Sequence, residues 1–347
     1  MTPRERILAA INHEPVDRIP LDYWGVPEIT DKLMKHFGVT DEIGFAKALG
    51  IDKIMGVGAV LTADRQNMWD VEMRQIALPG GIGYYEEYAS NPLAGYETID
   101  EIEASYTWPT TDMFDYSNIK KDCEYIRNAG YTVEGGYTSL TYFYDMLRGT
   151  EQMFLDFAGD KELAEYILYK INEFSAAHTR KILEAGDGLI DLTQVTDDLG
   201  SQTGLLMSQD MIEHYLGKYY ESNVKLAHEY GATVFHHDDG AVAELIPWIV
   251  DKGCEVLNPI QWHSPGWDLK EIKQKYGDKL CFHGGIDNQF VLPFGTVDDV
   301  ILEVETCIDI LASDGTGYIL APCHAVQANT SIENILTMYE TARKYKF

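Results

Sequence analysis

Two short segments of the chain concentrate side chains that can bind a metal ion or move a proton. Residues 235–240 read Phe-His-His-Asp-Asp-Gly, and residues 321–324 read Ala-Pro-Cys-His. Each segment follows a short apolar run that is typical of a β-strand. An α/β barrel builds its active site from groups at the C-terminal ends of its strands. The two segments therefore indicate an enzyme.

In the first segment, the alternation of an extended chain places His237 and Asp239 on one side and His236 and Asp238 on the other. An imidazole and a carboxylate on one side are suitable ligands for zinc or another divalent metal. A polar loop explains the same residues without a metal, because Asp-Asp-Gly favours a turn that caps the next helix.

The second segment adds the thiol of Cys323 and the imidazole of His324 at another strand end. Both groups suit zinc, and one of them would complete a site of three protein ligands with an open position for water or substrate. The alternative is a Cys323 buried as a small apolar residue and a His324 bonded to a carbonyl group. The sequence leaves open which of the two would bind the metal.

Other predicted strand ends offer groups for proton transfer and substrate binding. Asp198 follows Asp197, and repulsion between the two carboxylates would suit an acid or base, although a helix cap explains them equally well. His236 and His283 are further candidates for proton transfer, and His283 also for metal binding. Candidate substrate contacts, several of them aromatic residues that could equally belong to the core, are Asp22, Tyr23, Trp24, Asp52, Tyr137, Gln261 and Trp262.

Strand-like and helical patterns alternate along the chain, and the strands and helices that they predict must position these groups. Eight segments predict strands: 19–24, 51–55, 131–136, 188–193, 232–236, 254–258, 279–283 and 317–321. Helical patterns separate most of them, which favours an α/β fold, a (β/α)8 TIM barrel. Residues 56–128 are less regular, contain hairpin-like runs at 69–77 and 83–88, and predict an insertion in the N-terminal third. We expect residues 1–347 to form a single domain.

The composition narrows the classes of function. The chain has 347 residues, 45% of them hydrophobic, and a formal net charge of -29. Such a charge disfavours nucleic acids and polyanionic substrates. Neither a membrane-spanning run nor a signal peptide is expected, so a cytoplasmic location is the default. Five cysteines without a Cys-x-x-Cys pair predict no disulfide framework.

Several motifs, in their order along the chain, resemble the uroporphyrinogen decarboxylase (URO-D) superfamily. That superfamily contains the haem-pathway decarboxylase and zinc-dependent methyltransferases that act with corrinoid proteins, and its fold is the barrel inferred above. The matching motifs are RERILAA (4–10), PVDRIP (15–20), LGID (49–52), MLRGTE (146–151), DDLGSQ (197–202), FHHDDG (235–240), GGID (284–287) and CHAVQANT (323–330).

The resemblance is greater to the methyltransferase branch. The decarboxylase branch carries two arginines shortly after Pro-x-Asp-x-x-Pro, whereas residues 21–27 read LDYWGVP without arginine. The methyltransferase branch carries His-x-Cys-Gly after the fifth strand and a cysteine six residues before a threonine near the end. Here Asp239 replaces the first cysteine. His324 stands six residues before Thr330, with Cys323 one place earlier.

The resemblance implies a metal-dependent methyltransferase that moves a methyl group between a small O-, N- or S-methyl substrate and a corrinoid protein. The chain has no Asp-x-His-x-x-Gly corrinoid motif, so the corrinoid would belong to a separate partner. A homodimer is compatible with the sequence. The alternatives are a metal-free decarboxylase or lyase that uses Asp52, Asp198 and His324, and a non-catalytic barrel that binds a small molecule.

Overall fold

Seven parallel strands form the central sheet, in a computed structural model that describes residues 1–77 and 83–346. Their order in the sheet is their order along the chain: β1 (Ile54–Val57), β6 (Thr132–Ser139), β7 (Leu192–Thr196), β8 (Thr233–His237), β9 (Val256–Asn258), β10 (Cys281–Ile286) and β11 (Tyr318–Pro322). Seven of the eight predicted strands are confirmed, with ends that differ by a few residues.

The eighth predicted strand, at residues 19–24, forms only an isolated bridge between Leu21 and Leu320. The segment nevertheless connects the two edges of the sheet. Asp22 N donates to Leu320 O over 2.9 Å, and Asp52 N donates to Leu21 O over 2.7 Å. The fold is therefore an α/β fold of the TIM-barrel type, with a curled seven-stranded parallel sheet.

The inside of the curled sheet is filled by one apolar layer to which six strands contribute a residue each. The layer contains Ile54, Leu192, Phe235, Val256, Cys281 and Ile319. Helix α1 (Pro3–Ile11) packs against this layer through Ile7, Ala10 and Ile11. The layer stands at or near the starts of most strands, so α1 covers their N-terminal ends. The polar groups at the opposite ends face a mouth that α1 does not cover.

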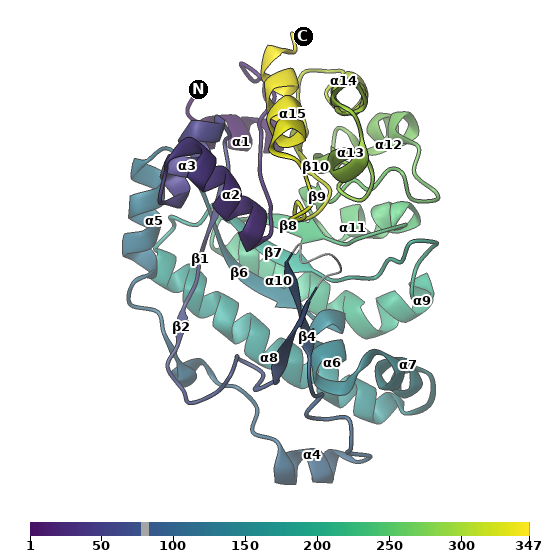
Figure 1. Cartoon of the computed structure of the whole chain (residues 1–347). Coiled ribbons are helices and arrows are strands. Elements are labelled where there is room, and N and C mark those ends of the chain that lie inside the picture. The colour runs from purple at the N-terminus through teal and green to yellow at the C-terminus, as the bar shows by residue number, and fades with distance from the viewer. Residues whose placement is uncertain (78–82, 347) are drawn as a thin grey trace.

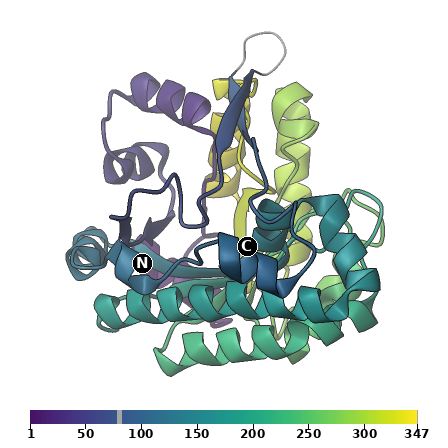
Figure 2. The same ribbon diagram turned by 90° about the horizontal axis from the view of Figure 1, so that it is seen from below.

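Helices surround the sheet, and Figures 1 and 2 show the long α8 (Lys161–Gly186) and α10 (Lys218–Glu229) side by side on one flank. Figure 1 also shows α1, α2 (Pro27–Phe37) and α3 (Glu42–Leu49) beside the C-terminal α15 (Ile332–Lys344). The other helices longer than one turn in the described residues are α4 (Ile99–Ser105), α5 (Ile119–Asn128), α6 (Thr141–Arg148), α7 (Thr150–Gly159), α11 (Ile246–Asp251), α12 (Leu269–Tyr276) and α14 (Val297–Leu311).

Residues 56–128 contain two small antiparallel sheets besides α4 and α5. Strand β2 (Val60–Leu61) pairs with β5 (Phe114–Asp115), and β3 (Met73–Ala77) pairs with β4 (Tyr84–Tyr88). The second pair confirms the predicted hairpin, whereas α4 and α5 were not predicted. Figure 2 shows the hairpin extending away from α8 and α10, and Tyr84 N donates to the Glu28 carboxylate of α2 over 3.1 Å.

All five cysteines are buried and free, which confirms the prediction of no disulfide. Within the described ranges, no helix is both long and apolar enough to cross a lipid bilayer.

Candidate metal centre

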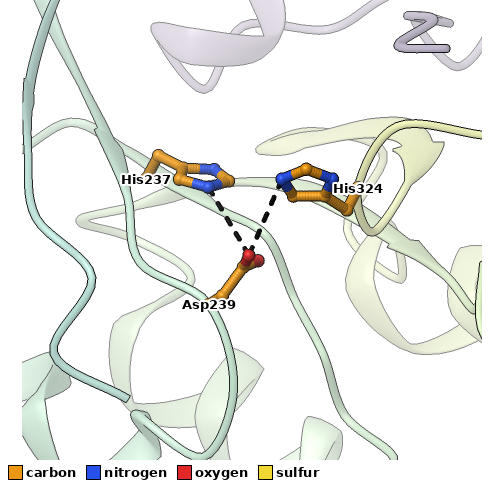
Figure 3. A group of neighbouring side chains, drawn as sticks. All are labelled: His237, Asp239 and His324. Carbon is orange, nitrogen blue, oxygen red and sulfur yellow. Dashed lines mark ion pairs between the residues drawn. The ribbon is translucent and has the colours of Figure 1, made fainter. Parts of the chain in front are cut away.

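Three side chains from two strand ends meet at the mouth of the sheet. His237 is the last residue of β8, Asp239 follows two residues later, and His324 lies two residues beyond β11. Their ligand atoms all lie within 4.8 Å of one another. Asp239 Oδ2 is 3.8 Å from His237 Nε2 and 3.7 Å from His324 Nε2. Figure 3 shows the carboxylate placed between the two imidazole rings. We call His237, Asp239 and His324 the triad.

The alternation predicted for residues 236–239 is confirmed. Phe235 faces the apolar layer inside the sheet, and the ring of His237 lies 5.5 Å from that of Trp24 on the same side. His236 faces outward, where Nδ1 lies 3.0 Å from the Tyr220 hydroxyl of α10. Gly240 then turns the chain with φ of 90°, and a Cβ there would lie 2.4 Å from the Ser201 carbonyl oxygen. Glycine is therefore required for the loop that returns Asp239 to the mouth.

A chain of buried hydrogen bonds fixes the orientation of the His237 ring. His237 Nδ1 lies 2.5 Å from Asn258 Oδ1, Asn258 Nδ2 lies 2.7 Å from His283 Nδ1, and His283 Nε2 lies 3.0 Å from Asp22 Oδ2. The carboxamide oxygen can only accept, so His237 carries its proton on Nδ1 and presents the lone pair of Nε2 to the triad. Hydrogen-bond partners of this kind orient histidine ligands in metal sites.

Asp22 ends this chain of hydrogen bonds as a buried carboxylate. Burial on its own would raise the pKa of Asp22, but the hydrogen bond from His283 and the nearby charge of Lys53 hold that pKa below its usual value. The carboxylate also accepts from Ile54 N over 3.1 Å. Asp22 and His283 are fully buried. Their positions fit support of the triad rather than contact with a substrate.

We expect Asn258→Leu to weaken zinc binding roughly tenfold to 100-fold, although the change removes no metal ligand. The Nδ1–H group of His237 would lose its acceptor, and the ring would no longer be held with Nε2 toward Asp239. Competition with a chromophoric chelator measures the affinity. The matched control Asn258→Asp keeps an acceptor oxygen and should retain most of the affinity. Wild-type affinity in Asn258→Leu would contradict this role.

The surroundings of Asp239 hold its pKa above the usual value. Burial raises the pKa of Asp239, while His237 and His324 lower it and Asp198 raises it further. Asp198 Oδ1 lies 3.9 Å from His237 Nε2, and its side chain is 47% exposed. Asp239 Oδ1 is buried without a hydrogen-bond partner among the described residues. Because no hydrogen bond from the described part of the chain occupies Oδ1, this oxygen is available as a metal ligand.

Cys323 is buried and is not part of the triad. Its sulfur lies 3.4 Å from Ile260 O, and burial raises the pKa of its thiol well above the ordinary value. Alternation along β11 would place Cys323 inside with Ile319, but the chain bends after Pro322, at residues 323 and 324. The bend turns the thiol away and brings His324 into the mouth.

Three other predicted residues lie away from the triad. His236 is fully buried on the outer side of β8, with Nδ1 2.9 Å from Val195 O, which argues against proton transfer at the mouth. Asp52 precedes β1 instead of following it and is bound by Arg6 and Arg18, so it does not face the mouth. The predicted strand began three residues too early. Trp262 donates from Nε1 to Gly285 O over 2.9 Å, outside the cavities described below.

Tyr23, Trp24, Tyr137 and Gln261 line cavities, and the cavity of Gln261 includes two residues of the triad. Trp24 packs against both imidazoles of the triad, at 5.5 Å from His237 and 6.4 Å from His324 between ring centroids. Trp24 and Tyr23 line a cavity of about 480 Å³. The Tyr23 hydroxyl lies 3.0 Å from Thr30 Oγ1.

Tyr137 lines a mainly apolar cavity of about 270 Å³ that also contains Glu134 and His178. Burial raises the pKa of Glu134 to about 7, partly offset by a 2.8 Å hydrogen bond from Gln194, and burial lowers the pKa of His178 to about 4. At neutral pH His178 is therefore neutral, and Glu134 is divided between its protonated and ionised forms.

Gln261 lines a polar cavity of about 360 Å³ that includes Asp239 and His324. The other lining residues are Gln202, Asn288, Gln289, Pro293, Phe294, Gln327 and Asn329. None of these other residues was predicted as a site residue. The spacing of asparagine and glutamine residues along a sequence does not indicate a binding site. These residues are identified only because the fold brings them together around one cavity.

Comparisons with known proteins found a family profile and solved structures that are similar to the chain. The family profile described as uroporphyrinogen decarboxylase (URO-D) matches residues 130–345. Among curated sequences, none matches the chain significantly. A solved methyltransferase from Methanosarcina mazei is similar over 99% of both chains, with 19% identity and a TM-score of 0.69. Xylanase XynB from Paenibacillus barcinonensis is similar over 72% of this chain and 87% of its own, with 12% identity and a TM-score of 0.38. By the profile match over most of its length, the chain belongs to the uroporphyrinogen decarboxylase (URO-D) family.

Proposed function

We propose that the protein is a metal-dependent methyltransferase, with zinc or another divalent ion, that moves a methyl group between a small O-, N- or S-methyl compound and a separate corrinoid protein. The observation that carries the proposal is the triad, which two strand ends of a URO-D family chain bring together. The likeness in fold to a methyltransferase supports the same reading.

The triad fits zinc by the chemistry of its donors. Two imidazole nitrogens and a carboxylate oxygen are ligands that zinc accepts, and three protein ligands leave room for water or substrate. The buried, unpartnered Oδ1 of Asp239 is a polar atom whose burial a cation would compensate. The hydrogen bond from His237 to Asn258 leaves Nε2 free as a ligand.

Bound at the triad, the ion would act as a Lewis acid on the oxygen, nitrogen or sulfur atom that carries the methyl group. A methyl group transferred as a cation equivalent leaves its bonding electron pair on that atom, which then takes up a proton, while the acceptor supplies the new electron pair. Asp198 lies beside His237 and is half exposed, so it can exchange a proton with solvent and pass it to the departing atom.

The corrinoid would enter on a partner protein, because the chain carries no corrinoid motif of its own. The half-exposed His324 keeps one side of the triad accessible from solvent. We further propose one (β/α)8 domain over residues 1–347, with 56–128 as an insertion, in a cytoplasmic protein that is compatible with a homodimer.

A metal-free decarboxylase is the weaker alternative. That reaction needs cations to hold a carboxylated substrate, and no Lys or Arg is among the residues that line the cavity beside the triad. Asp52, which the alternative would use, is occupied by Arg6 and Arg18.

The test is methyl transfer to free cob(I)alamin from a panel of methyl ethers, methylamines and methyl thioethers, followed by absorbance. We expect transfer with zinc-loaded protein, loss after chelation and recovery on adding zinc back. Carbon dioxide release from a carboxylated compound by the chelated protein would favour the decarboxylase. A protein that binds small molecules without turnover in either assay would be a binding barrel.

A further inference from the structure

We propose that the polar cavity beside the triad selects an uncharged, polyhydroxylated substrate, presented as its methyl ether. The inference rests on the proposed function, because it assigns the substrate class of that site. Asp239 and His324 belong both to the triad and to the wall of this cavity. A molecule held in the cavity is therefore next to the metal ligands.

Carboxamides dominate the cavity wall. Six of the ten lining residues are asparagine or glutamine: Gln202, Gln261, Asn288, Gln289, Gln327 and Asn329. A carboxamide both donates and accepts hydrogen bonds, as a hydroxyl group does, and carries no charge. A wall of this composition matches a ligand with several hydroxyl groups.

Asn288 provides the most specific requirement. Its side chain is buried, with the residue 8% exposed, and Nδ2 donates to Ala325 O over 3.3 Å. Oδ1 is buried and has no hydrogen-bond partner among the described residues. A buried acceptor without a partner costs free energy, so a ligand donor that reaches this oxygen from the cavity would recover that cost. A hydroxyl group supplies that donor.

Two glutamines provide complementary groups. Gln261 Oε1 accepts from Gly240 N, which leaves the amide N–H groups of Gln261 to donate. Gln327 Nε2 donates to Ala325 O over 2.9 Å, which leaves Oε1 of Gln327 to accept. Asn288 and Gln327 thus accept while Gln261 donates, and a polyol can satisfy all three.

The charges near the cavity disfavour ionic ligands. An anion would meet no Lys or Arg among the lining residues, and Asp198 lies beside the triad. A cationic group would be repelled by a divalent ion at the triad, and an anion attracted by that ion would still face Asp198 without a Lys or Arg partner in the cavity wall. The uncharged ligand avoids both costs.

The donor set and the opening of the cavity favour an ether of such a ligand. Imidazole and carboxylate ligands make a harder metal site than thiolates, which suits oxygen better than sulfur. Phe294 lines the cavity and is 73% exposed, which places its ring at the opening. The C–H face of a hydroxylated ring can cover this aromatic surface.

Binding to zinc-loaded protein tests the inference without any methyl transfer. The probes are a mono-O-methyl-inositol, methoxyacetate and 2-methoxyethylammonium, and calorimetry gives each Kd. We expect the neutral probe to bind roughly tenfold or more tightly than either ion. Tighter binding of methoxyacetate or of the ammonium would overturn the proposed class.

Two variants assign the cavity residues. Asn288→Leu should weaken binding of the inositol ether about tenfold, because the acceptor is lost, and the exposed Asn128→Leu is the matched control. Gln261→Glu keeps the oxygen that binds Gly240 but removes the donor, so it should weaken the neutral probe and strengthen the ammonium. If Asn288→Leu fails to fold, the Gln261→Glu variant by itself tests whether the cavity residues bind the neutral probe. Unchanged binding of the neutral probe in the folded variants would refute the assignment.

The outcomes separate this inference from the methyltransferase proposal. Selective binding of the inositol ether with no methyl transfer to cob(I)alamin would remove the reaction but keep the cavity assignment. Methyl transfer from a charged donor, with no preference for the neutral probe, would keep the reaction and remove the substrate class.

Discussion

His237→Ala is expected to lower zinc affinity by roughly 100-fold or more, beyond the loss typical of a residue that only supports a ligand. The change removes one of three ligands and leaves His324 and Asp239 to hold the ion. It also leaves Asn258 Oδ1 without its donor. Elemental analysis after gel filtration gives the metal content, and titration of the apoprotein gives the affinity.

The matched control is His263→Ala. His263 also follows a strand end, but its Nε2 lies 2.9 Å from Glu303 and it is not part of the triad. This variant should keep a wild-type metal content. His324→Ala repeats the test at a half-exposed side chain, where loss of fold is not expected. Stoichiometric zinc retained by both triad variants would exclude the site.

Asp52→Ala is expected to destabilise the fold by about 3–5 kcal/mol, the usual cost of removing one partner from a buried ion pair. The carboxylate is fully buried, pairs with Arg6 and Arg18, and accepts from Leu21 N over 2.9 Å. Leu21 lies in the segment that connects the two sheet edges. The loss would therefore weaken the fold where the sheet closes. Urea unfolding followed by circular dichroism measures the free energy.

Asp17→Ala provides the comparison, because Asp17 binds the same Arg6 from a side chain that is 45% exposed. Solvent reaches the Asp17 side of this pair and screens it, so this variant should lose only about 1 kcal/mol. If Asp52→Ala proved as stable as the wild type but lost binding of methylated compounds, Asp52 would be a substrate contact after all.

The sequence by itself located most of the elements that build the site. Apolar runs of strand length predicted the strands that now carry His237 and His283, and helix periodicity predicted α8 and α12. The alternation of side chains in an extended chain also predicted that His237 and Asp239 share a side. His237 ends β8, and Asp239 lies two residues beyond it. These features depend on residues near one another in the chain, so local patterns contain them.

Only the tertiary structure shows that His324, and not Cys323, lies next to His237 and Asp239. Strand alternation favours Cys323, but the bend after Pro322 reverses the two side chains, and no local pattern fixes where β11 stops. In the same way, β1 starts three residues later than predicted. Asp52 therefore lies before the strand, in a buried ion pair, and not at the mouth.

The network from His237 through Asn258 and His283 to Asp22 and the carboxamide cavity also required the tertiary structure. Their members come from distant parts of the chain. The curl of the sheet and the register between its strands set the distances between such groups, and neither quantity is recorded in the order of residues along one strand.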